Sequence, residues 1–220
     1  MSGNLLQVVV FFGLLGYLFW RNLPGALIFL RPGWIRCEIA GGRESVPFAT
    51  RGQAMGEMSA ELEELGFEPL GVLVEKRPLR RGRREVIFAN PDARAMAVVA
   101  EVGNEAWLHY VTRFDDGATV ITADYRWPSV EEPGYLAGGL PGAGPQEVLL
   151  THKRRVQRFL DEGRALDERY TLEARAEACS AYYDRGPGRR EVRRREIKGM
   201  MFTTAALIVV VLTAIDAARR

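Results

Sequence analysis

The spacing of apolar and polar residues changes along the chain, and each spacing predicts a different kind of structure. Residues 5–20 and 200–215 are apolar runs without a charged residue or a polar face at helical spacing. The stretch from Gly52 to Gly66 repeats Met and Leu along one face of a predicted helix. From residue 70 to residue 127 the period falls to two, which is typical of β-strands. The pattern therefore predicts a domain of helix and sheet between two uncharged helices.

Both apolar runs are predicted to be transmembrane helices. With its small flanking residues, the run at 200–215 can cross about 30 Å of hydrocarbon at about 1.5 Å per residue. The alternative is a core helix, but a protein this small could hardly bury such a helix on every side. For the run at 5–20 the alternative is a cleaved signal peptide. No basic residue precedes Leu5, however, and no A-x-A-like cleavage site follows Trp20.

Basic residues beside the two runs predict the orientation in the membrane. No Lys or Arg precedes the first run, whereas three Arg residues follow it by Arg36. Six basic residues lie shortly before the second run, and only Arg219 and Arg220 follow it. Because basic flanks are retained on the cytoplasmic side, both runs predict that the termini lie outside and residues 31–198 lie in the cytoplasm. The predicted location is therefore a bacterial-type inner (plasma) membrane.

Five strands are predicted between the runs, at 70–77, 85–89, 93–102, 105–114 and 118–127. Short turns separate the last four, and Asp116-Gly117 is the strongest hairpin signal among them. Connections this short join antiparallel neighbours, so the predicted fold class is α+β with a five-stranded antiparallel meander flanked by helices.

The two hairpin turns also predict which side chains share a face of the sheet. If Gly103-Asn104 and Asp116-Gly117 close two-residue loops, one face is apolar enough to receive helices. The opposite face carries Met96, Val98, Trp107, His109, Val111, Arg113, Val120, Thr122 and Asp124. Its apolar members Met96, Trp107 and Val111 are the predicted partner-binding residues.

Nine of the eighteen residues from Pro128 to Pro145 are Pro or Gly, so this segment is predicted to be an irregular loop, either a lid or a disordered spacer. A helix is predicted at 146–162, and a charged helical stretch follows Gly163. The predicted organisation is a transmembrane helix, an interfacial segment that Pro24 and Gly25 separate from it, the α+β domain, a charged stalk and a second transmembrane helix, at 1–22, 23–36, 37–163, 164–198 and 199–220.

Composition narrows the range of ligands that the chain is expected to bind. The net charge of +2 gives no global reason to expect nucleic-acid binding. The two cysteines, Cys37 and Cys179, match no metal-ligand spacing and make no disulfide framework, which fits a reducing compartment. Asp115-Asp116-Gly117 lacks the remaining positions of an EF-hand loop. We therefore expect neither a metal nor a cofactor.

The weak catalytic candidates are His109 and Asp124, which the assumed register places opposite each other. A carboxylate beside a histidine raises its pKa and makes it a possible acid or base. No nucleophile or phosphate-binding loop accompanies the pair, so a cross-strand polar contact is the simpler interpretation.

Two basic clusters are candidates for binding anionic phospholipid headgroups. One lies on the connection between the first two predicted strands, and the other directly precedes the second apolar run. Topology signalling or a solvated hairpin tip are the alternatives. The candidate residues are Lys76, Arg77, Arg80, Arg81, Arg83, Arg84, Arg189, Arg190, Arg193, Arg194, Arg195 and Lys198.

These observations favour a non-enzymatic integral membrane protein that presents its domain as an adaptor or assembly subunit of a membrane-associated complex. An unknown protein partner or a second copy of the chain would bind the exposed sheet face. The alternative is a lipid- or small-molecule-binding module with residues 128–145 as its lid. A third class is an enzyme acting on a membrane-bound substrate through His109 and Asp124.

Overall fold

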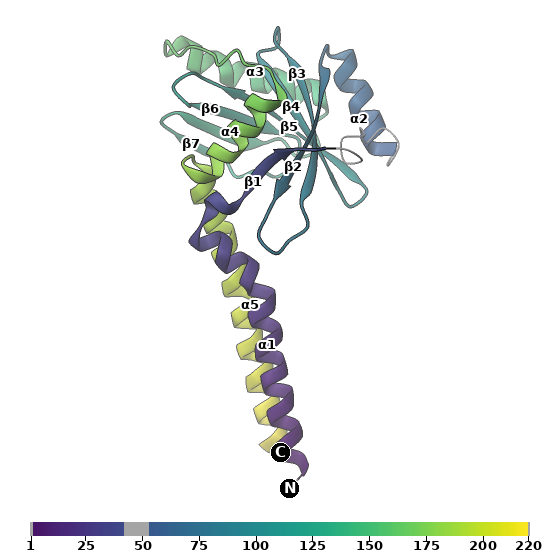
Figure 1. Cartoon of the computed structure of the whole chain (residues 1–220), viewed down its shortest axis with the longest axis vertical. Helices are drawn as coiled ribbons and strands as arrows, with labels where there is room; N and C mark the ends of the chain where they lie inside the picture. The colour runs from purple at the N-terminus through teal and green to yellow at the C-terminus, as the bar shows by residue number, and fades with distance from the viewer. Residues whose placement is uncertain (1, 42–52, 220) are drawn as a thin grey trace. The chain divides into compact units, whose positions relative to one another are not determined.

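The computed structural model describes residues 2–41 and 53–219 (Figure 1). Two compact units divide the chain. We call the first the helical unit; it comprises Met1–Arg36, Lys76–Arg81 and Ser180–Arg220. We call the second the sheet unit; it comprises Cys37–Glu75 and Gly82–Cys179.

Two long helices, α1 (Ser2–Leu30) and α5 (Gly188–Arg219), lie side by side in the helical unit (Figure 1). Both are long and apolar enough to cross a membrane, by length and composition. The predicted break at Pro24 is wrong, because α1 continues through this residue to Leu30. A proline removes one helical hydrogen bond without necessarily ending a helix. The short helix η1 (Pro32–Trp34) follows.

Polar contacts fix α1 against α5 near the C-terminal end of α1. Arg193 donates hydrogen bonds from Nε to the carbonyl of Phe29 at 3.0 Å and from Nη2 to that of Leu30 at 3.4 Å. These carbonyls belong to the last turn of α1, where no helical N–H groups remain to bond them. Glu196 is buried against Gly25, where a Cβ atom would lie 2.8 Å from its Oε2. The basic stretch of α5 thus also serves to hold the two helices together.

The sheet unit contains one eight-stranded mixed sheet, so the predicted five-stranded antiparallel meander is correct only in part. Its order is β1-β2-β3-β4-β5-β6-β8-β7, and the β6–β8 pair is parallel. All five predicted strands are present, as β2 (Glu68–Lys76), β3 (Arg83–Asn90), β4 (Ala95–Val102), β5 (Glu105–Arg113) and β6 (Thr119–Ala123). The additional strands are β1 (Arg36–Ile39), β7 (Val130–Glu132) and β8 (Tyr135–Gly139).

Strands β7 and β8 lie within the segment that was predicted to be an irregular loop. Tyr135, Leu136 and Ala137 are buried, because β8 lies between β6 and β7 in the sheet. A Cβ atom at Gly139 would lie 1.9 Å from the carbonyl oxygen of Tyr125, so the close approach of the two backbones requires glycine. The prediction of an irregular loop at 128–145 is wrong for these residues, and an interior strand is not a lid.

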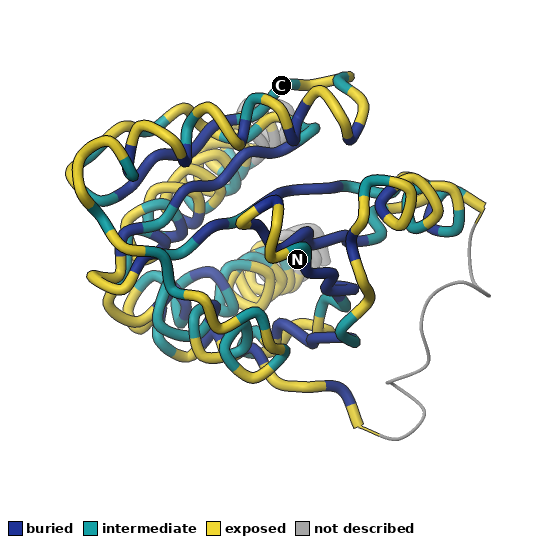
Figure 2. The backbone as a smooth tube through the Cα atoms, turned by 90° about the horizontal axis from the view of Figure 1, so that it is seen from above, coloured by how far each residue is buried: buried dark blue, intermediate teal, exposed yellow. Residues whose placement is uncertain are grey.

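Helices cover both faces of the sheet. We call the face that was predicted to receive helices the first face, and the opposite one the second face. Helices α2 (Gln53–Glu64) and α3 (Pro145–Asp161) lie over the first face and bury the main core (Figure 2). They confirm the predicted helices, although Gly52 lies outside the described residues. On the second face, the first turns of α4 (Leu172–Asp184) pack Leu172 and Ala176 against a small apolar cluster of Leu73, Ile87 and Val98.

The register of β4 and β5 confirms the predicted faces, but that of β6 is shifted by one residue. Arg113 pairs with Thr119, so the residues between them form a loop longer than Asp116-Gly117 alone. Ile121 therefore pairs with Val111, and Thr122 pairs with Tyr110. A one-residue shift moves each side chain to the opposite face, so Val120 and Thr122 lie on the first face.

A disulfide joins Cys37 of β1 to Cys179 of α4, with the Cα atoms 5.9 Å apart. Both cysteines are buried in the sheet unit. The bond spans 142 residues of sequence and ties an edge strand to the helix on the second face. These two cysteines were expected to make no disulfide framework, and the bond between them departs from that expectation.

Candidate functional site

The structure separates the two weak catalytic candidates. His109 pairs with Ala123 in the sheet, and Asp124 accepts a hydrogen bond from the backbone N–H of Leu108 at 3.0 Å. The nearest polar partner of the His109 ring is the Tyr125 hydroxyl, 3.5 Å from Nδ1. Burial, together with nearby arginines, holds the pKa of His109 well below its usual value. The expected raised pKa is wrong, and His109 is a neutral residue of the domain interior.

Among the predicted partner-binding residues, only Trp107 lies beside an open cavity. Met96 is buried, and Val111 packs against the small apolar cluster beneath α4. Trp107 is partly exposed and lines a cleft of about 720 Å³. The cleft lies between α2, the β4–β5 turn and the segments that follow β6 and β8. Its lining residues are Ala54, Glu57, Met58, Glu61, Asn104, Glu105, Ala106, Trp107, Asp124, Tyr125, Arg126, Pro141 and Gly142.

Two stacked aromatic rings form one wall of this cleft. The ring centroids of Trp107 and Tyr125 lie 4.7 Å apart, with 22° between the planes. The Trp107 indole N–H donates a hydrogen bond to Glu105 Oε2 at 3.1 Å. Trp107 lies on strand β5, and Tyr125 follows strand β6. The pairing of these two strands thus brings together two side chains that are 18 positions apart in the sequence. Stacked, hydrogen-bonded rings form a rigid wall with electron-rich faces.

Carboxylates predominate among the charged groups of the cleft. Glu57 and Glu61 project from neighbouring turns of α2, and Glu105 and Asp124 come from the sheet side. Arg126 is the one basic residue in the lining. Partial burial raises the pKa of Asp124 to about 6, although the hydrogen bond from Leu108 opposes this shift. The lining thus has four acidic side chains and one basic side chain, and Asp124 becomes charged as the pH rises through about 6.

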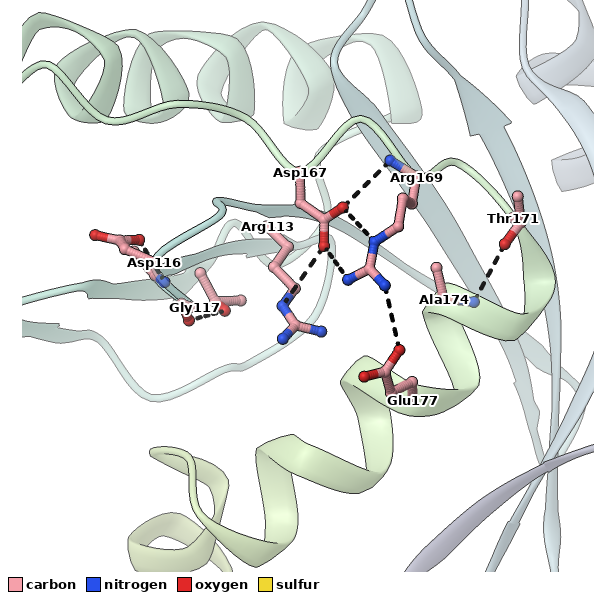
Figure 3. A network of polar contacts seen from close by, with 10 residues as sticks. Arg113, Asp116, Gly117, Asp167, Arg169, Thr171, Ala174 and Glu177 are labelled. Carbon is pink, nitrogen blue, oxygen red and sulfur yellow. Dashed lines mark hydrogen bonds and ion pairs between the residues drawn. The ribbon is translucent and has the colours of Figure 1, made fainter.

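A second groove, of about 860 Å³, is lined by Arg94, Asp115, Gln157, Leu160, Arg164, Ala165, Leu166, Asp167, Glu168 and Arg169. Two of its charged residues, Asp167 and Arg169, are paired with each other and with Arg113 and Glu177 (Figure 3). Asp167 accepts hydrogen bonds from Arg169 Nε and Nη2, both at 2.8 Å, and lies 3.9 Å from Arg113 Nε. Arg169 also reaches Glu177 of α4 at 3.4 Å. The hydrogen bonds from Arg169 lower the pKa of Asp167 and outweigh its partial burial.

His152 of α3 is buried in a different network, on the first face of the sheet. Its ring nitrogens lie 2.9 Å from the Thr112 hydroxyl and 3.1 Å from that of Thr122. Arg155 also donates to Thr122 and to the carbonyl of Gly138 in β8. These groups satisfy one another, so the network fastens α3 to β5, β6 and β8.

Several predicted headgroup-binding residues already have protein partners. Arg80 pairs with Glu196 inside the helical unit, and Arg83 pairs with Glu75 and Glu85 inside the sheet unit. Arg193 bonds α1, as described above. Lipid binding by the remaining residues stays a prediction.

Sequence reasoning found Trp107 but not its neighbours in the cleft. Glu57 and Glu61 have the spacing of one helical turn, which was the available signal for an acidic stripe on α2. Tyr125 was assigned to the opposite face, because the predicted β6 register was off by one. Within the described residues, no group of three or more His, Cys, Asp or Glu is placed to hold a metal ion.

Carboxylates around an aromatic wall suit a cationic group: the acids attract it and the ring faces accept it. Comparison with known proteins adds no family to this geometry: no family model, no curated protein and no solved structure matches the chain.

Proposed function

We propose that this chain is a membrane-anchored, non-enzymatic adaptor whose cleft at Trp107 holds a basic segment of a partner protein. Helices α1 and α5 would cross the membrane and keep the sheet unit at its surface. One observation carries the proposal: the open cleft combines a stacked Trp–Tyr wall with an excess of carboxylates.

The chemistry of the cleft specifies the charge of its occupant. A lysine or arginine over an aromatic face contributes about 0.5–1 kcal/mol where exposed and about 2 kcal/mol when desolvated. Like charges repel one another, and a bound cation relieves this repulsion. An anionic ligand would face four carboxylates, so acidic peptides and nucleic acids fit the cleft poorly.

Binding can be measured with the full chain in nanodiscs of phosphatidylcholine, which has no net charge. The probe is a fluorescent peptide of alternating lysine and glycine, followed by polarisation. We expect Glu57→Gln/Glu61→Gln to weaken binding about tenfold, because two carboxylates leave the cleft. Trp107→Ala should weaken it by a similar factor through loss of the aromatic wall.

A matched control is available on the same helix. Glu63 and Glu64 are exposed and do not line the cleft, so Glu63→Gln/Glu64→Gln changes the net charge equally. We expect this variant to bind like the wild type. Equal losses in the two double variants would mean that the peptide responds only to overall charge, and the cleft would then have no special role.

The natural partner requires an experiment in native membranes. Crosslinking, followed by mass spectrometry of the purified chain, should recover a protein whose crosslinked peptides are rich in Lys or Arg. The yield should fall in Trp107→Ala and persist in Glu63→Gln/Glu64→Gln. A partner crosslinked equally to all three proteins would contradict the proposed binding site.

A further inference from the structure

We infer that the connection between β2 and β3 makes a third membrane contact, with Leu79 entering the boundary between headgroups and acyl chains of anionic phospholipids. This inference rests on the proposed membrane anchoring by α1 and α5. It concerns residues Lys76–Arg81, which belong to the helical unit although the strands on either side belong to the sheet unit.

An ion pair places this connection beside the start of the apolar run of α5. Arg80 Nη1 and Nη2 donate to the two carboxylate oxygens of Glu196 at 3.5 and 3.4 Å. Glu196 precedes Met200, where the uncharged run begins, by four residues. At about 1.5 Å per residue, the ion pair lies about 6 Å along the helix axis from the apolar run. If the hydrocarbon core of a bilayer surrounds the apolar run, the ion pair therefore lies in the headgroup region.

Leu79 is an apolar residue that the connection exposes to the surroundings. Its side chain is 60% exposed, and its backbone has φ of 55°, a left-handed conformation that leucine rarely adopts. Basic residues surround it in the sequence, from Lys76 to Arg84. An apolar side chain within a basic loop is the arrangement by which peripheral segments enter anionic membrane surfaces.

Other residues near the C-terminal end of α1 also suit a membrane interface. Leu30 is 67% exposed at the end of α1, and Trp34 of η1 is 43% exposed. The guanidinium of Arg31 lies 5.6 Å from the centre of the Trp34 ring. Tryptophan and arginine are common where apolar and aqueous phases meet. The connection would thus add to a membrane boundary that α1 and η1 would supply in the helical unit.

Photocrosslinking of the full chain can test the contact. Leu79 is replaced by benzoylphenylalanine, and the protein is placed in nanodiscs with equal parts of phosphatidylglycerol and phosphatidylcholine. We expect lipid adducts at position 79, enriched in phosphatidylglycerol, when the protein is analysed by mass spectrometry. The same replacement at Asp92, in the exposed turn of the sheet unit after β3, should give none.

Replacement of Phe202, which is 79% exposed on α5, separates this inference from the proposed anchoring. Adducts at 202 without adducts at 79 would overturn the third contact and leave the anchoring intact. Absence of adducts at both positions would contradict the anchoring itself. Arg81→Gln should lower the phosphatidylglycerol enrichment at 79 by up to about fivefold, whereas Arg126→Gln in the sheet unit should not change it.

Discussion

Two open cavities of the sheet unit, similar in size, differ in how their charges are balanced. The groove at Asp167 holds about 860 Å³ and the cleft at Trp107 about 720 Å³. In the groove, three acidic residues face three basic ones, and Asp167 bonds Arg169 directly. In the cleft, four acidic residues face one basic residue beside two stacked rings. Charge balance, rather than volume, therefore distinguishes a structural contact from a candidate binding site.

This difference has an energetic consequence. A paired, partly buried charge stabilises the fold, and removing one partner leaves the other unsatisfied. A carboxylate among other carboxylates costs stability until a cation arrives. Substitutions should therefore destabilise the protein on the Asp167 side and impair binding on the Trp107 side.

The largest expected effect is on the Asp167 side, where α4 carries both Glu177 and the disulfide residue Cys179. A crosslink over 142 residues restricts the unfolded chain, which corresponds to about 4–5 kcal/mol in the chain-entropy account. We expect Cys37→Ser/Cys179→Ser to lower the unfolding free energy by this amount in urea titrations of the full chain in detergent. The reductant-treated wild type should behave like this variant. Coincident curves for oxidised and reduced protein would contradict the prediction.

The state of these cysteines also bears on the side of the membrane that the domain occupies. The basic flanks favour the cytoplasm, whereas stable disulfides are typical of oxidising compartments. Acid-quenching of intact cells, followed by alkylation of thiols under denaturing conditions so that burial gives no protection, decides between them. Complete protection of Cys37 and Cys179 would place the domain in the oxidising compartment. Alkylation that disappears after oxidant treatment would place a reversible disulfide in the cytoplasm.

Asp167→Ala should have the next largest effect. It removes an acceptor of two 2.8 Å hydrogen bonds from Arg169 and the partner of Arg113. The expected loss is about 2 kcal/mol of unfolding free energy, because Arg169 is largely exposed, with peptide binding at the Trp107 cleft unchanged. Glu168→Ala is the control, because Glu168 is exposed in the same groove and should stay within about 0.5 kcal/mol. A loss of peptide binding in Asp167→Ala would contradict the prediction that the two cavities act independently.

The local elements of this fold could be predicted from the sequence, because each depends on periodicity that neighbouring residues display. Helices α2 and α3 and five strands have the expected type. The contacts that depend on distant residues could not be predicted in the same way. Strand β8 reads as a Gly- and Pro-rich loop until its backbone meets that of Tyr125. Nothing local distinguishes Cys37 and Cys179 as a pair, since 142 residues separate them.

The candidate cleft was harder to predict than the fold for a specific reason. Counting Asp116-Gly117 as the whole turn shifted β6 by one residue, which paired Asp124 with His109 and moved Tyr125 away from Trp107. Hydrogen bonds from Ala118 to Asp116 and from Gly117 to Phe114 lengthen the turn. A single register error therefore produced a catalytic pair that does not form and concealed an aromatic pair that does.

The smallest expected effect is a gain in unfolding free energy rather than a loss, and it concerns Asp124 in the cleft. Burial raises its pKa from 3.8 to about 6, so between these values the folded state binds the proton more tightly than the unfolded state. This contribution to stability is present below about pH 4 and is lost as the pH rises through 6. Asp124→Asn lacks the titration, and its amide oxygen can still accept the Leu108 N–H bond.

The variant should therefore match the wild type below about pH 4 and exceed its unfolding free energy by about 1–2 kcal/mol above pH 6, after allowance for partial exposure. Urea titrations at pH 4, 5, 6 and 7 measure the difference, and parallel curves would contradict the assigned pKa. The same substitution should weaken binding of the lysine peptide at pH 7 but not at pH 5, where the wild-type carboxyl is already largely protonated. A substitution that stabilises the protein while weakening its binding would show that the carboxylate is retained for the ligand, because in the fold alone its charge is unfavourable.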